Sequence, residues 1–175
     1  ELSDKSFDIT KARINLFNYN NKSKLINDEA ENLNKYFNSN SNLDLIYSFG
    51  VLHHSSSLKK CLKTIRSIMS KKTICKIMLY AKNSYKYFLM KDNLIRYEAQ
   101  KGVPVIDFYN INDLNKLFKK FKILEIKQDF IFPYKIKPYK RNRYYKIDHF
   151  KYMKKDIFNS LKKNLGEHLL ITLKK

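Results

Sequence analysis

One apolar run, Leu43–Phe49, constrains the fold of this chain more than any other segment. It reads Leu-Asp-Leu-Ile-Tyr-Ser-Phe, shows no apolar/polar alternation, and stops at Gly50, shortly before His53 and His54. A run of this kind is typical of a parallel strand that helices cover on both faces. Because ligands bind beyond the carboxyl ends of parallel strands, we expect the residues after this strand to lie at a crevice.

The remaining periodicities alternate between strand and helix. Apolar residues at helical offsets, with capping residues such as Ser3 before them, predict helices over residues 4–18, 58–69, 84–100, 110–121 and 153–164. Short apolar runs predict strands over residues 24–27, 43–49, 73–79, 123–132 and 168–173. This alternation predicts an α/β fold: a mostly parallel sheet with helices on both faces and right-handed crossovers.

Length and composition predict a single soluble domain. The chain has 175 residues, of which 43% are hydrophobic, and it contains no apolar stretch near the ~18 residues that cross a bilayer. The first residues show no signal-peptide pattern. Its two cysteines, Cys61 and Cys75, lack the spacing of a metal site or disulfide framework, so we expect buried thiols and a cytoplasmic protein.

The charge is strongly positive. The net charge of +20 favours nucleic acid, anionic lipid surfaces or phosphorylated substrates as partners, although lysines are spread along the whole chain. The segment Tyr134–Lys146 mixes cations with aromatic residues, as grooves for single-stranded nucleic acid do. It is equally compatible with a lipid head group, a sugar phosphate, or a solvated insert over the active site.

Two motifs carry a family resemblance. Asp44-Leu-Ile-Tyr-Ser-Phe-Gly-Val-Leu-His-His54 resembles the segment that closes the fourth strand of class I S-adenosylmethionine (SAM)-dependent methyltransferases, and Ala30-Glu-Asn-Leu33 resembles their adenine-contacting turn. The resemblance implies a Rossmann-like sheet whose last strand is antiparallel and inserted beside the fifth. It also implies SAM as cofactor and methyl transfer to a small-molecule acceptor.

The resemblance also implies residues for the nucleoside. Glu1-Leu2, followed by serine and a helix, is similar to the family's step after the second strand, so Glu1 is the candidate for the ribose hydroxyls. Glu29 and Ala30 align with the step that contacts adenine. Because Asp28 is adjacent, this alignment could shift by one residue, and a solvated acidic turn is the alternative.

Ser48, Phe49 and Gly50 are expected to face the methionine part of the cofactor. Glycine permits close approach of the chain, and an aromatic ring favours contact with a sulfonium cation. Phe49 is equally compatible with a place in the core. His53 or His54 is a candidate general base, since imidazole titrates near neutral pH, and no third ligand lies at metal spacing.

A glycine-rich turn for the cofactor is missing from the sequence. The only glycines are Gly50, Gly102 and Gly166, so we expect an N-terminal piece to lie outside this chain. Residues 1–175 are then one domain, with inserts at about 80–108 and 129–155 that select the acceptor. Residues expected to face the acceptor, or to be ordinary loop residues, are Tyr80, Asn83 and Tyr85.

Two alternatives to a small-molecule methyltransferase remain. One is a nucleic-acid-binding module or an RNA methyltransferase that uses the basic Tyr/Lys-rich insert. The other is a noncatalytic remnant that keeps the sheet and no longer binds the cofactor.

Overall fold

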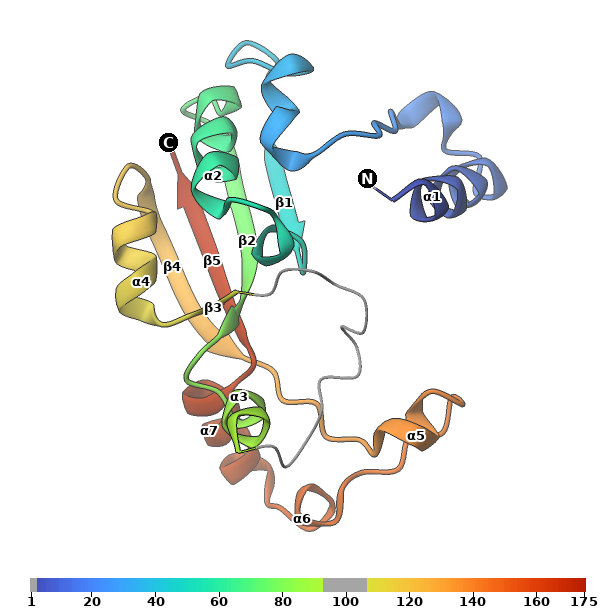
Figure 1. Ribbon diagram of the computed structural model, residues 1–175, viewed down its shortest axis with the longest axis vertical. Helices are drawn as coiled ribbons and strands as arrows, with labels where there is room; N and C mark the ends of the chain where they lie inside the picture. Colours follow the sequence, from blue (N-terminus) through green and yellow to red (C-terminus); the bar gives the residue numbers. More distant parts are fainter. Residues whose placement is uncertain (1–2, 93–106) are drawn as a thin grey trace.

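A five-stranded sheet organises this chain (Figure 1). In the computed structural model, which describes residues 3–92 and 107–175, the strands are β1 (Leu45–Phe49), β2 (Ile74–Ala81), β3 (Phe108–Tyr109), β4 (Lys122–Asp129) and β5 (His168–Lys174). Their order is β1-β2-β5-β4, and the short β3 pairs with the end of β2. Strand β1 runs parallel to β2, whereas β5 is antiparallel to both β2 and β4. The predicted α/β fold class, with an antiparallel last strand beside the fifth, is confirmed.

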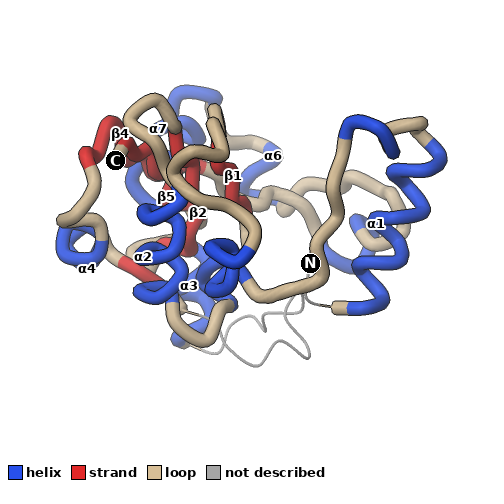
Figure 2. Tube along the Cα trace, turned by 90° about the horizontal axis from the view of Figure 1, so that it is seen from above, coloured by secondary structure: helices blue, strands red, loops and turns tan. Residues whose placement is uncertain are grey.

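Helices and 3-10 turns connect these strands. The helices are α1 (Asp4–Leu16), α2 (Leu58–Ile68), α3 (Tyr85–Lys91), α4 (Ile111–Leu117), α5 (Ile136–Tyr139), α6 (Asp148–Lys151) and α7 (Lys155–Leu165). The 3-10 turns are η1 (Asn20–Lys22), η2 (Ala30–Lys35) and η3 (Leu52–His54). Helix α1 contains no buried residue, and Figure 2 shows it beside the sheet rather than packed on it.

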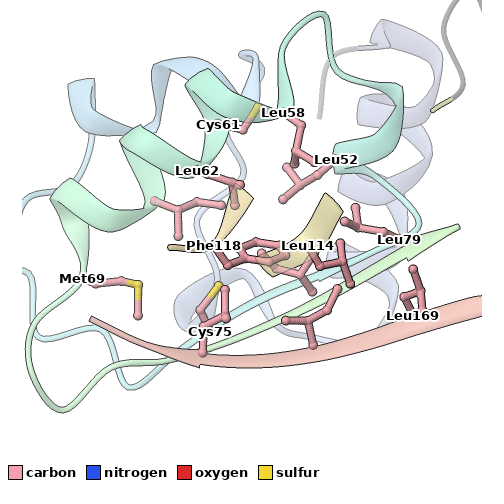
Figure 3. Close-up of a cluster of buried hydrophobic side chains, with 14 of the residues drawn as sticks. Leu52, Leu58, Cys61, Leu62, Met69, Cys75, Leu79, Leu114, Phe118 and Leu169 are labelled. Carbon is pink, nitrogen blue, oxygen red and sulfur yellow. The ribbon is translucent and has the colours of Figure 1, made fainter. Parts of the chain in front are cut away.

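The core lies between one face of the sheet and helices α2 and α4 (Figure 3). Helix α2 turns four apolar residues towards it, because its apolar positions recur at helical spacing: Leu58, Cys61, Leu62 and Ile65. The sheet contributes alternate residues of β2 and β5, because alternate side chains of a strand point to the same face: Cys75, Ile77, Leu79, Leu169, Ile171 and Leu173. Both thiols are buried in this core, and burial raises the pKa of Cys75 to about 12.

Capping residues start the two helices that cover the core. The Ser57 side chain accepts a hydrogen bond from the Lys60 backbone N–H at the start of α2. At the start of α4, Asn110 and Asp113 form a reciprocal capping box, as their spacing predicts. Both helices therefore begin within a residue or two of the positions expected from sequence.

The predicted short strand over residues 24–27 is wrong. These residues pair with no strand in the described chain, and the Asn27 side chain instead donates a hydrogen bond to Asp4 Oδ1 at 2.9 Å. A four-residue run forms a strand only where a neighbour satisfies its backbone, and none of the described strands lies beside it.

The expected burial of β1 on both faces is also wrong. Ile46 and Ser48 face the core, but Leu45, Tyr47 and Phe49 are 54%, 64% and 47% exposed. The reason is position: β1 is the last strand in the described sheet order, and the side chains on its outer face stay largely exposed. A half-covered edge strand alternates in burial even where its sequence is continuously apolar.

Several predicted elements differ from the observed ones at their ends. Strand β4 stops at Asp129 instead of residue 132, because Phe130 adopts a positive φ of 71° that breaks the extended backbone. Helix α7 begins at Lys155, two residues later than predicted. Of the helix expected over 84–100, the structure shows Tyr85–Lys91; residues 93–106 lie outside the described part. No helix among the described residues combines the length and apolarity that a membrane crossing requires.

Candidate functional site

The last two residues of β1 and the glycine that follows them differ in character. The Ser48 hydroxyl is buried and has no hydrogen-bond partner in the described structure. The Phe49 ring is 47% exposed and stacks on Tyr47, with 6.0 Å between ring centroids. Gly50 has a φ of +75°, a conformation that favours glycine. This corner therefore offers a polar atom without a partner and an open aromatic face next to a sharp change of chain direction.

The histidine pair follows in η3. His53 is fully buried, and neither ring nitrogen makes a hydrogen bond within the described residues. Burial, followed by repulsion from His54, lowers the pKa of His53 to about 4, against a small opposing effect of the Met78 backbone. Its imidazole is thus neutral at neutral pH. The ring centroids of His53 and His54 are 4.1 Å apart, and the ring of Tyr80 lies 3.9 Å from that of His53.

His168 joins this cluster and is the residue that sequence reasoning missed. Its ring stacks on Phe130 at 4.5 Å and meets the edge of Phe49 at 5.5 Å and the face of Tyr80 at 6.1 Å. Burial and the nearby Lys86 charge lower the pKa of His168 to about 4. A sequence signal was available, because an antiparallel last strand starts at the edge where the parallel strands end, and His168 is its first residue.

The acidic turn before η2 separates into residues with different partners. Asp28 accepts hydrogen bonds from Asn32 Nδ2, the Tyr36 hydroxyl and the Glu29 backbone N–H, each at 2.7 Å. These bonds, with Asn32 the strongest contributor, lower the pKa of Asp28 to about 2. Glu29 is exposed, and its carboxylate makes no ion pair or hydrogen bond with a described residue. Of the two carboxylates, Glu29 is therefore the one available to a ligand.

Glu31 links this acidic turn to the histidine turn. Its carboxylate accepts from the Ser56 hydroxyl at 2.6 Å and from the Ser57 backbone N–H at 3.0 Å, and its carbonyl accepts from Thr64. Ser56 is the second residue after η3, so the bonds hold η2 beside the segment that carries both histidines. Ala30 packs against the core and anchors the same turn. The structure thus brings the acidic turn to the edge at which β1 ends.

The remaining expected residues have other neighbours or lie outside the described chain. Glu1 and Leu2 are not among the described residues. Asn83 follows β2 and lines a cavity of about 200 Å³ together with Tyr109, Asn110 and Gln128. The Tyr85 hydroxyl lies 3.0 Å from His149 Nε2. Within the described residues no group of three His, Cys, Asp or Glu side chains is arranged to hold a metal ion.

Comparison with known proteins shows the fold. No protein-family model and no curated protein sequence matches the chain. Among solved structures, a SAM-dependent methyltransferase from Thermotoga maritima superposes with a TM-score of 0.63 at 16% identity, covering 100% of this chain and 71% of that one. A SAM-dependent methyltransferase from Archaeoglobus fulgidus gives 0.53 at 16% identity, covering 89% and 69%.

A third similar structure is a candidate sarcosine dimethylglycine methyltransferase from Galdieria sulphuraria, with a TM-score of 0.62 at 10% identity and coverage of 100% and 68%. At such identities the likeness shows architecture. The chain has the Rossmann-like fold of class I SAM-dependent methyltransferases, as its two motifs implied.

Proposed function

We propose that this chain binds SAM and transfers its methyl group to a small-molecule acceptor. The observation that carries the proposal is the corner at the end of β1, where the unpartnered Ser48 hydroxyl, the open Phe49 ring and the left-handed Gly50 lie near a turn with an available carboxylate. Ligands of open α/β sheets bind at this edge. The three similar structures, which have the same fold, are SAM-dependent or candidate methyltransferases.

Each residue of the corner has a distinct task in this proposal. Glu29 accepts a hydrogen bond from the adenine amino group, because its carboxylate has no competing partner among the described residues. The Ser48 hydroxyl bonds a polar group of the methionine part, which satisfies an otherwise orphaned buried atom. Phe49 offers its ring face to the positive sulfur. Glu1 and Leu2, outside the described residues, are proposed to hold the ribose.

The histidines complete the proposed chemistry. When bound, SAM supplies an electrophilic methyl group on a sulfonium, so no protein nucleophile is needed and the chain's task is to align the reactants in a dry site. An acceptor hydroxyl must lose a proton as the methyl group arrives, whereas an ammonium must lose one beforehand, because its nitrogen otherwise has no lone pair for the new bond. The imidazole of His53 or His54 takes that proton in this proposal. Burial lowers the pKa of His53, so its ring is neutral and has a free lone pair at neutral pH, but the same burial weakens it as a base.

A small-molecule acceptor is favoured by two of the similar structures. The Thermotoga protein is described as a candidate histamine N-methyltransferase, and the Galdieria protein as a candidate sarcosine dimethylglycine methyltransferase. Both descriptions name small amines. We extend this class of acceptor to the present chain as part of the proposal.

Calorimetry with S-adenosylhomocysteine tests cofactor binding. We expect measurable binding by the wild-type chain, and roughly tenfold weaker binding by Glu29→Ala, the loss typical of one hydrogen bond to a charged group. Glu125→Ala, which removes an exposed carboxylate from β4, is the matched control and should bind as the wild type does. Absence of binding by the wild type would overturn the proposed function. Equal binding by Glu29→Ala would overturn the adenine contact alone.

A further inference from the structure

The segment after β4 forms a closed hairpin of its own. Tyr134 and Lys146 make an antiparallel bridge, and the Lys135 and Ile147 backbone N–H groups donate to the carbonyls of Tyr145 and Pro133 at 2.8 and 2.9 Å. Helix α5 lies inside this loop. We call residues 133–147 the basic hairpin; its two ends are fixed to each other by backbone hydrogen bonds, so it presents a defined surface.

The charge of the basic hairpin has one sign. It contains no Asp or Glu, and its six cations are Lys135, Lys137, Lys140, Arg141, Arg143 and Lys146. All six residues are exposed. Lys135 pairs with Asp148, just outside the hairpin, at 3.3 Å, whereas Lys137, Arg141 and Arg143 pair with no acidic residue of the described chain. Cations with no acidic partner remain available to an anionic ligand.

Aromatic rings sit between these cations. Tyr139 packs edge-on against Phe132 at 4.8 Å and against Tyr144 at 5.6 Å, and Tyr134 contacts both tyrosines. Rings that pack on one another are already partly ordered before a ligand stacks on them. Tyr144 and Tyr145 nevertheless stay 64% and 59% exposed. The hairpin therefore combines rings that pack on one another with open ring surface.

We infer that the basic hairpin binds single-stranded nucleic acid. Phosphates meet the unpaired lysines and arginines, and unstacked bases lie on the exposed tyrosine rings, the two contacts that surfaces for single strands combine. A duplex hides its base faces and would leave the tyrosines unused. A lipid surface is the less suitable ligand, because the hairpin's aliphatic residues, Ile136 and Ile147, are partly buried rather than projecting.

The position of the basic hairpin agrees with a role beside the sheet's ligand edge. Figure 1 shows α5 and α6 beyond the end of the sheet at which β1 and β2 finish. A nucleic-acid strand bound to the hairpin would lie at the same end of the molecule as the corner at the end of β1. This inference concerns binding and does not depend on methyl transfer.

Fluorescence anisotropy with a labelled oligouridylate of about 15 nucleotides, longer than one typical binding site, tests the inference. The wild-type chain should bind the probe, with affinity falling steeply as salt rises. The triple variant Lys137→Ala, Arg141→Ala, Arg143→Ala should bind at least tenfold more weakly and show a salt dependence smaller by roughly two released ions. The control removes three exposed charges elsewhere, by Lys116→Ala, Lys119→Ala and Lys120→Ala, and should bind almost normally.

A second pair of variants separates base stacking from charge. Tyr145→Ala removes an exposed ring without changing the net charge and should weaken binding about tenfold. Tyr19→Ala removes a ring of similar exposure far from the hairpin, at 54%, and should leave binding unchanged. The inference would be overturned if the hairpin and control charge variants lost affinity for the probe equally, or if Tyr145→Ala lost none. Binding of phosphatidylserine vesicles that exceeds binding of the probe would overturn it as well.

Discussion

At the scale of single residues, two glycines show how different physical causes lead to the same residue type. Gly50 adopts a φ of +75°, while a Cβ added to it would make only an ordinary contact with the Met78 methyl at 3.6 Å. Gly166 has an ordinary φ of −61°, but an added Cβ would overlap the backbone carbonyls of Lys162 and Asp129. Backbone strain explains the first glycine and close packing the second.

These causes predict different costs for alanine. Gly50→Ala should lower the free energy of unfolding by about 1 kcal/mol, the penalty of a left-handed conformation. Gly166→Ala should cost about 3 kcal/mol or prevent folding, because backbone carbonyls on both sides cannot rotate away. Urea denaturation of the two variants measures the difference. A Gly166→Ala chain as stable as the wild type would refute the packing argument.

At the scale of elements, local capping decides where helices begin, and neighbours decide whether strands exist. The α4 start follows from the Asn110 and Asp113 side chains, which satisfy each other's backbone groups. Residues 24–27 have strand-like composition but no partner strand in the described sheet, and they stay irregular. A cap depends on residues three apart, whereas strand pairing depends on residues distant in sequence.

The α4 cap can be tested by a single substitution. Asn110→Ala removes the acceptor for the Asp113 backbone N–H and should destabilise the fold by about 1 kcal/mol. Asn112→Ala, an exposed position inside the same helix, should be neutral or slightly stabilising, since alanine has the higher helix propensity. Thermal denaturation followed by circular dichroism compares the two. A larger loss in Asn112→Ala would contradict the capping explanation.

At the scale of the whole molecule, the two faces of the sheet differ at β1: one packs on the core, and the other leaves its side chains exposed. The core lies on the side of α2 and α4, while Leu45, Tyr47 and Phe49 face outward. The sheet edge that carries the candidate site also gathers His53 and His168, both with lowered pKa values. Two neutral imidazoles in one cluster couple the stability of the fold to pH.

That coupling has a definite sign. The pKa of each histidine is about 4 in the folded chain and 6.5 in the unfolded chain, so between these values the unfolded chain binds more protons. The contribution of each histidine to the free energy of unfolding is fully present above pH 6.5 and is lost as the pH falls towards 4. It changes by at most about 1.4 kcal/mol per pH unit for each histidine.

Urea midpoints measured from pH 7.5 downwards check this expectation. His53→Phe should reduce the dependence on pH, whatever its effect on stability at neutral pH. His149→Gln, which changes an exposed histidine, should keep the wild-type dependence. An unchanged pH dependence in His53→Phe would show that His53 is not protonated on unfolding.

The sequence by itself determined the α/β class, the apolar stripe of α2, the start of α4 and the turn at Gly50, because periodicity, caps and glycine conformations are local properties. Only the tertiary structure decided that the Asp28 carboxylate is hydrogen-bonded while that of Glu29 is available, that the buried ring nitrogens of His53 have no hydrogen-bond partner among the described residues, and that His168 joins the cluster. These outcomes depend on which side chains meet across distant segments. A one-dimensional pattern carries periodicity, but burial and contact arise only when the strands and helices pack.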